Sequence, residues 1–228
     1  CFFIHSCFPS HMPSSSFFRF RPLLLAAACL AATGAAQADY LWLSRDGANA
    51  AARIGELDKT PQPVTGVSAP RAFLADGKDL PLTTEADRVV IPAAAGADLR
   101  AVASRAGGEA GKATLTQYQA RWGRTETKAV NDLELVPTEP GGNTFKLVWK
   151  GSTVPATQVN VDTSEGWRRV LRPAKDGTVT LGTPFPGLYV LEVTARVNGA
   201  VTVDGKKYDE VRHTATLSFE VPAKNAGQ

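Results

Sequence analysis

The residues that could bind a transition metal are few, and most lie near the end of the chain. His213 is the only histidine after residue 38, and Asp209 and Glu210 precede it closely. Imidazole and carboxylate groups are typical ligands of divalent transition metals, which require several such groups at once. We predict a metal site at His213, completed by Asp209 and Glu210 or by Asp39 and its terminal amine. The alternative is a strand-edge histidine that only makes hydrogen bonds.

A hard cation such as Ca²⁺ is a weaker interpretation of the same region. Asp204, Asp209 and Glu210 surround the turn 204–207, but lysines lie between them and no D-x-D-x-D-G loop is present. Clustered oxygen ligands are required for such a cation. A solvated hairpin is the expected structure here.

Trp167 is the candidate for contact with a partner protein. It follows Gly166 and precedes the pair Arg168-Arg169. An exposed tryptophan in a β-sandwich can anchor a partner or stack on a sugar ring. The alternative for Trp167, as for the other tryptophans, is packing in a core, because tryptophan is highly buried on average.

Catalytic motifs are absent from the sequence, and no catalytic residue is predicted. The chain has neither a G-x-S-x-G elbow nor an H-E-x-x-H helix motif. Residues 106–113 resemble a phosphate loop but have Ala106 in place of the first glycine and Ala113 in place of the hydroxyl residue. We therefore expect a protein that is not an enzyme. A pair of carboxylates acting on envelope polymers is the remaining catalytic alternative.

The segment from Met12 to Ala38 has the three parts of an export signal. Arg19 and Arg21 supply positive charge, 22–32 is a short apolar run, and 36–38 is a small-x-small cleavage site. The apolar run is shorter than a membrane-spanning helix. We expect cleavage before Asp39 and a periplasmic or secreted protein.

Two features lie before or within this signal. Residues 1–11 fit no part of it, and we expect them to be an over-extended start of translation. Cys29 lacks the Leu that lipoprotein signals place three positions earlier, since Ala26 occupies that position. Lipidation at Cys29 is therefore the alternative, and removal with the signal is the expectation.

Charge and cysteine content limit what the mature chain can do. The full chain has a net charge of +3, and loss of Arg19 and Arg21 reduces it to +1. Nucleic-acid binding requires clustered basic residues, so we expect no nucleic-acid partner. All three cysteines precede Asp39, so the expected mature chain has no disulfide. A hydrophobic core must then stabilise it.

Alternating apolar and polar residues, separated by Gly, Pro, Asp and Asn, predict an all-β fold after residue 38. In the first part the expected strands are 40–43, 51–54, 71–74, 88–91 and 99–102, with 114–122 either a strand or a short helix. In the second part they are 144–149, 158–161, 166–171, 178–181, 188–196, 201–203 and 213–221. Strands at this spacing favour a sandwich.

The chain divides into four expected segments. Residues 1–38 are the upstream extension and signal, 39–130 an N-terminal β domain, 131–222 a β-sandwich, and 223–228 a tail. The boundary is placed near residues 130–132, ahead of the P-T-E-P-G-G loop at 137–142. The expected architecture is two β units in sequence.

Three sequence blocks of the second unit resemble the prealbumin-like, or carboxypeptidase regulatory-like, β-sandwich. They are K-G-S-T-V-P-A at 150–156, D-G-T-V-T-L at 176–181 and P-G-L-Y-V-L-E-V at 186–193. In that fold such blocks open a strand pair, form a hairpin and begin a core strand. The resemblance implies tight turns at Gly151, Gly177 and Gly187.

The wider layout is similar to a family of periplasmic proteins of unknown function that are often described as nickel or cobalt uptake accessory components. The likeness rests on the aromatic start at Tyr40-Leu41-Trp42, the β first half, the sandwich and the final strand at 212–219. Many members begin with histidine, whereas this chain has Asp39. The resemblance implies an accessory protein that assists Ni²⁺ or Co²⁺ uptake. The alternative is a non-catalytic module that docks on a membrane transporter or an outer-membrane receptor.

Overall fold

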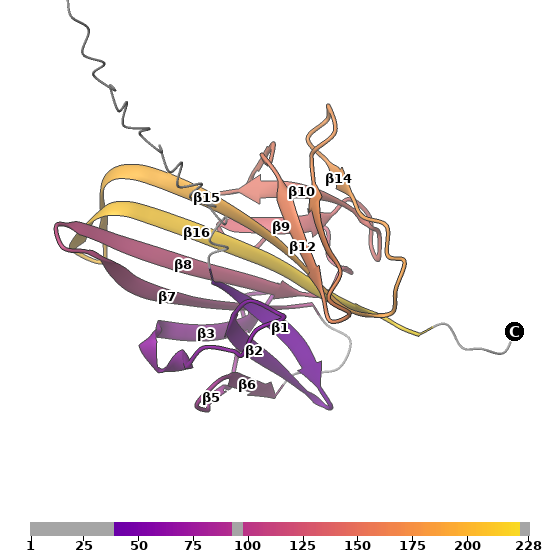
Figure 1. Cartoon of the computed structure of the whole chain (residues 1–228), viewed down its shortest axis with the longest axis horizontal. Coiled ribbons are helices and arrows are strands. Elements are labelled where there is room, and N and C mark those ends of the chain that lie inside the picture. The colour runs from indigo at the N-terminus through magenta and orange to yellow at the C-terminus, as the bar shows by residue number, and fades with distance from the viewer. Residues whose placement is uncertain (1–38, 93–97, 224–228) are drawn as a thin grey trace, which may run out of the picture. The chain divides into compact units, whose positions relative to one another are not determined.

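The computed structural model describes residues 39–92 and 98–223, and within them the chain forms sixteen strands and one short 3-10 turn (Figure 1). The first part contains β1 (Tyr40–Asp46), β2 (Asn49–Gly55), β3 (Ser68–Leu74), β4 (Asp79–Leu80), β5 (Thr83–Thr84), β6 (Val89–Pro92), β7 (Leu99–Glu109) and β8 (Lys112–Trp122). The second contains β9 (Leu133–Pro137), β10 (Thr144–Trp149), β11 (Ser152–Val154), β12 (Val159–Thr163), β13 (Arg168–Leu171), β14 (Val179–Thr180), β15 (Gly187–Val203) and β16 (Lys206–Val221). The predicted all-β class is confirmed.

The strands form three sheets. The largest has eight strands in the order β13-β12-β15-β16-β8-β7-β3-β4. A four-stranded sheet has the order β1-β2-β6-β5, and a third sheet joins β9 and β11 to β10, which also pairs with β14. Within the large sheet, β16 and β8 are parallel, whereas their other neighbours are antiparallel.

Two hydrophobic cores lie on opposite faces of the large sheet. Leu217 of β16 belongs to one core, but its register partner on β8 is Arg121, and the adjacent Ala120 belongs to the other core. Successive side chains on a strand point to opposite faces. The apolar face therefore changes sides between β16 and β8. The β1-β2-β6-β5 sheet covers one face, and the β9-β10-β11-β14 sheet covers the other, which makes two sandwiches with one shared sheet.

The predicted boundary near residue 130 separates the cores but not the sheets. One core consists of buried residues between Leu41 and Ala120, and the other of buried residues between Leu133 and Phe219. The large sheet crosses the boundary because β16 of the second part pairs with β8 of the first over nine residue pairs. The described residues accordingly belong to one compact unit. Hydrophobic pattern alone identifies a core, but not which strands share hydrogen bonds.

Two glycine turns occur where the sequence places them. Lys150 and Gly151, with φ of 47° and 82°, form the tight connection between β10 and β11. Gly187 has φ of 117°, and a Cβ there would approach Ser164 Oγ to 2.5 Å. Both positions favour glycine because positive φ strains residues with a side chain. A β-sandwich is present, and the closer likeness to the prealbumin-like fold stays a prediction.

Three segments differ from the expected strands or resolve an alternative. Residues 114–122 lie in strand β8, not in a helix. Asn198-Gly199 does not end a strand, because β15 continues to Val203 through a register shift between Asn198 and Val201. The segment 133–137, where no strand was predicted and whose last residue was expected in the 137–142 loop, is strand β9, which pairs with β10. A β-bulge accommodates turn-forming residues without ending the strand.

The predicted export signal, the residues before it and Cys29 all lie outside the described residues. Among the described residues, no helix has the length and apolar character needed to cross a membrane.

Leu217 provides a test of the core on the second sandwich. Its side chain is fully buried within the cluster that contains Leu191 and Phe219. Leu217→Ala is expected to lower the free energy of unfolding by about 2–5 kcal/mol, because it leaves a cavity in a packed core. Urea unfolding monitored by tryptophan fluorescence measures the loss. Val170→Thr, at a side chain that is 51% exposed, is the control and should change it by less than about 0.5 kcal/mol.

Candidate functional site

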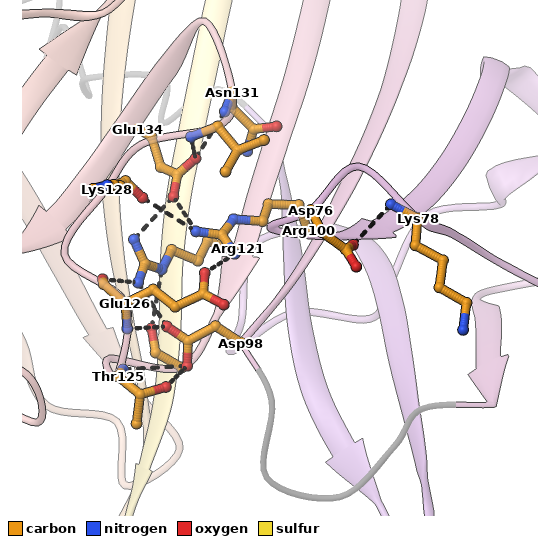
Figure 2. Close-up of polar contacts among 12 residues, drawn as sticks. Asp76, Lys78, Asp98, Arg100, Arg121, Thr125, Glu126, Lys128, Asn131 and Glu134 are labelled. Carbon is orange, nitrogen blue, oxygen red and sulfur yellow. Dashed lines mark hydrogen bonds and ion pairs between the residues drawn. The ribbon is translucent and has the colours of Figure 1, made fainter.

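The change of apolar face leaves two buried arginines on the shared sheet. Arg100 of β7 and Arg121 of β8 are register partners, and both side chains are fully buried. Their side chains point to the face of the large sheet that carries the second core, next to the apolar side chains of β16. A buried charge is costly unless it is paired and hydrogen-bonded. The segment between β8 and β9 supplies most of the partners (Figure 2).

Glu134 is the acceptor at the centre of this network. Its Oε1 accepts hydrogen bonds from Arg100 Nη2 at 3.0 Å and from Arg121 Nη1 at 2.9 Å. Its Oε2 accepts from the backbone N–H groups of Val130 at 2.9 Å and Asn131 at 2.8 Å. One carboxylate therefore joins both arginines to the turn that leads into β9.

Asp98 is the second acceptor of the network and lies at the start of β7. Its Oδ2 accepts from Arg121 Nη2 at 2.6 Å and from the N–H of Glu126 at 3.0 Å, and its Oδ1 accepts from Thr125 Oγ1 at 2.5 Å. Burial acts to raise the pKa of Asp98, but the donors from Thr125, Glu126 and Arg121 outweigh it, so the pKa is lowered. The carboxylate stays charged at neutral pH.

Arg100 completes the network through Glu126. Its Nη1 donates to the Glu126 carboxylate, and Arg121 donates to the Glu126 carbonyl. Burial acts to lower the pKa of Arg100, yet the charge of Glu134 and the hydrogen bonds raise it. The network fastens 125–134 onto the sheet, and with it the start of β9. It is a structural latch that the sequence analysis missed. The local pattern gave no signal of it, because an arginine between apolar neighbours, as in Ala120-Arg121-Trp122, is also the pattern of a strand with one exposed face.

Substitution of Glu134 tests the latch. Glu134→Gln keeps the shape but removes the charge that both buried arginines share, and its amide N–H₂ would face their donors. Loss of one partner from a buried ion pair typically costs about 3–5 kcal/mol. We expect that loss in the free energy of unfolding, measured by urea denaturation. Glu85→Gln, in an exposed pair with Arg88, is the control and should cost less than about 1 kcal/mol. An equal effect in both variants would contradict the latch.

His213, the centre of the predicted metal site, is buried, and its nearest side-chain contacts are with Gln119 and Trp149. Its Nδ1 lies 3.2 Å from Gln119 Nε2, and its ring meets Trp149 edge-on with a centroid distance of 4.6 Å. Burial lowers the pKa of His213. The side chain makes a hydrogen-bond contact, as in the alternative interpretation, but β16 lies between β15 and β8 and is not an edge strand.

The three carboxylates predicted to join His213 make other contacts. Asp209 Oδ2 accepts from the N–H of Ala113 at 2.7 Å, and Asp39 Oδ2 accepts from Gln62 Nε2 at 2.7 Å. Glu210 and His213 point to opposite faces of β16, because they are three residues apart on one strand. Within residues 39–92 and 98–223, no group of three or more His, Cys, Asp or Glu could hold a metal ion. The structure therefore does not bring the predicted ligands together.

Glu210 is surrounded by cations. Its Oε1 lies 2.5 Å from Arg212 Nε and 4.0 Å from Arg196 Nε, and its Oε2 lies 3.1 Å from Lys112 Nζ. The hydrogen bonds from Arg212 and Lys112 lower the pKa of Glu210 from 4.5 to about 2. Through Lys112, this carboxylate connects β16 to the β7–β8 hairpin.

The lowered pKa of Glu210 predicts a pH dependence of stability. A carboxylate whose pKa is depressed by folding stabilises the protein above its unfolded pKa and loses this effect as pH falls through the folded value. We expect wild type to be more stable than Glu210→Gln above pH 4.5, and the difference to vanish as pH falls towards about 2. Urea unfolding across this range measures it. An NMR titration in Arg212→Met should show the Glu210 pKa moving up, and an unchanged pKa would contradict the assigned cause.

Trp167, the predicted partner-binding residue, is half-buried at the end of the second sandwich. Its ring packs against the core and lies 6.1 Å from the Phe185 ring and 6.5 Å from the Tyr189 ring, between centroids. Its backbone N–H donates to Thr163 Oγ1 at 3.0 Å. Phe185 beside it is 41% exposed. Packing accounts for most of the tryptophan ring, and partner binding there stays a prediction.

A second candidate surface, apart from Trp167, is formed by four strands that are longer than the sheets packed on them. β15 and β16, and likewise β7 and β8, run past the covering sheets as paired hairpins that lie side by side (Figure 1). We call residues 105–115 and 196–211 the strand extension. Most of its side chains are exposed, and none belongs to the two core clusters, although Leu115, Glu210 and Val211 at its base are buried. The sheet there is open to solvent on both faces.

The outer edge of the strand extension has unpaired backbone groups. β12 pairs with β15 only from Tyr189 to Glu192, so among the described residues the edge of β15 from Val193 to Val203 has no neighbouring strand. Arg196 is the only charged residue in that stretch, and proline is absent from it. Natural proteins usually protect such an edge with lysine, proline or a covering element. Only the register shift at Asn198 interrupts this one.

No family model matches the chain, and no curated protein is detectably similar to it in sequence.

Proposed function

We propose that this chain is an exported, non-catalytic interaction module that binds an envelope partner by adding a strand of that partner to the free edge of β15. The observation that carries the proposal is the unpaired edge from Val193 to Val203. Backbone N–H and C=O groups on a free edge supply the affinity of strand addition, and pockets for alternate side chains supply its specificity. Export follows from the sequence between Met12 and Ala38.

The charge around the edge indicates the kind of strand that would bind. Arg196 and Arg212 are register partners on one face, and Lys206 and Lys207 lie at the tip of the hairpin. Arg196 is 58% exposed and Arg212 33% exposed at their side chains, and both share the single carboxylate Glu210. Over residues 193–212 these four cations face three carboxylates, Asp204, Asp209 and Glu210. The remaining charge of +1 favours an extended segment that carries acidic residues. A transporter or outer-membrane receptor of the envelope would present it.

This function keeps one part of the metal-uptake hypothesis. A module that docks on a metal transporter would assist uptake without binding the ion itself. The predicted ligands Asp39, Asp209, Glu210 and His213 are each engaged with other groups. Direct Ni²⁺ or Co²⁺ binding has no comparable support from the described residues, so docking is the function that we put forward.

Photo-crosslinking tests the docking surface in cells that make the full chain. A photoreactive amino acid at Val197, which is 37% exposed, should crosslink to an extended acidic segment of one envelope transporter or receptor, mapped by mass spectrometry. A synthetic peptide of that segment should then slow amide hydrogen exchange from Val193 to Val203. The double variant Val197→Lys/Ala200→Lys should weaken peptide binding by about tenfold, because edge charges block strand pairing.

The control position is Arg169, on the edge strand β13, which β12 separates from β15 in the same sheet. A crosslink there but not at Val197 would move the docking surface to the Trp167 region and contradict strand addition at β15. A crosslink from Val197 to a second copy of the chain, with a dimer in sedimentation, would also contradict the proposal. Unchanged hydrogen exchange at the edge with bound peptide is the third contrary result.

A further inference from the structure

A pocket lies where β8 and β16 end, next to the buried latch and away from the strand extension. Its cavity volume is about 320 Å³, within the range of small-molecule sites. The pocket lining includes Arg45, Asp98, Trp122, Arg124, Phe219 and Glu220. Nothing in the proposed docking function requires this pocket.

Arg124 presents unused hydrogen-bond donors at the pocket. Its guanidinium stacks on the Phe219 ring, 3.9 Å from the ring centroid, and its Nη1 donates to Asn143 Oδ1 and to the Gly142 carbonyl. Among the described residues, Nε and Nη2 have no acceptor. No carboxylate of residues 39–92 or 98–223 forms an ion pair with this arginine, and burial lowers the pKa of Arg124. A planar guanidinium with two parallel donors free is the group that binds a carboxylate through both oxygens.

The opposite wall has a similar construction. The Arg45 guanidinium lies over the Trp122 ring, 5.8 Å from its centroid. Stacking on a ring holds each guanidinium in one orientation. The two arginines therefore give the pocket planar, weakly hydrated cationic surfaces, opposite in charge to Asp98 and Glu220, which also line it.

Glu220 gives the pocket an acceptor. Its side chain lines the cavity, and it has no hydrogen-bond or ion-pair partner in the part of the chain that the structure describes. A carboxylate accepts hydrogen bonds and donates none at neutral pH. Glu220 and Phe219, on whose ring Arg124 stacks, are successive residues of β16, so their side chains point to opposite faces of the sheet. A ligand that reaches both Arg124 and Glu220 must therefore extend around the end of β8, with a carboxylate at one end and hydroxyl donors at the other.

The latch holds this pocket in place. Asp98 and Thr125 line the cavity and are bonded to each other, and Asp98 is also bonded to the buried Arg121. Gly123, with φ of 96°, lies against Asp98, where a Cβ would come within 2.1 Å of Oδ1. The loop carrying Arg124 is therefore fastened on both sides, so its donors are positioned before a ligand arrives.

We infer that this pocket binds a small hydroxy-carboxylate, with its carboxylate on Nε and Nη2 of Arg124 and its hydroxyl groups on Glu220. Sugar acids, in ring form, and open-chain polyhydroxy acids share this chemistry. The charge of Arg45 adds attraction for the same anion. Binding of this class gives the module a small-molecule ligand in addition to its protein partner.

Isothermal titration of the purified protein at pH 7 and low salt, with D-glucuronate and D-gluconate as probes, tests the inference. At least one probe should bind saturably and at least tenfold more tightly than acetate, which lacks hydroxyls, or glucose, which lacks the carboxylate. Tighter glucuronate indicates a sugar acid, and tighter gluconate an open-chain acid. Absence of saturable binding by both probes would overturn the inference.

Variants of Arg124 connect the binding to the residue. Arg124→Met retains stacking volume over Phe219 and should weaken binding at least tenfold. Arg124→Lys keeps the charge but loses the paired donors, so its affinity should lie between those of wild type and Arg124→Met. Arg169→Met, outside the pocket, is the matched control with unchanged affinity. Thermal unfolding verifies that each variant is folded. Equal affinity in wild type and a folded Arg124→Met would also overturn the inference.

Discussion

The parallel pairing of β8 with β16 is the constraint on which the rest of the structure depends. It joins a strand of the first part to the last strand of the chain and makes one sheet out of two (Figure 1). The two cores lie on opposite faces of that sheet, so the joining strands cannot be apolar on one face throughout. Polar residues therefore occur on β8 where the apolar face changes sides. Gln119 and Arg121 pair with Ala215 and Leu217 of β16, but they do not belong to the second core.

This arrangement places charge inside the protein and then requires its neutralisation. Arg100 and Arg121 are fully buried, and the segment after β8 returns Glu126 and Glu134 to them (Figure 2). The hydrogen bonds also satisfy backbone N–H groups of the same segment, so few polar groups there are left unpaired. The Nε of Arg100 is one that has no described partner. The same latch supports the loop of Arg124 at the mouth of the pocket.

Local sequence patterns predicted much of the fold and little of the candidate site. Alternation identified the strands around Phe145, Leu191 and Leu217, because each such strand has one apolar face against a core. The turn at Lys150-Gly151 was predicted because tight hairpins require positive φ. The continuation of β15 past Gly199 was not predicted, since a bulge and a turn use the same residues. His213 was identified as a chemically capable residue, but its neighbours Gln119 and Trp149 are distant in sequence.

The sequence by itself determined the all-β class and the positions of most strands. These properties depend on the alternation of apolar and polar residues and on turn-forming residues, and both can be read within about ten residues of sequence. Only the tertiary structure decided that β8 and β16 are neighbours, that Arg121 meets Glu134 and that β15 has a free edge. Those outcomes depend on pairings between residues far apart in the chain. Every residue except proline offers the same backbone hydrogen-bonding groups, so a single sequence does not show which strands pair.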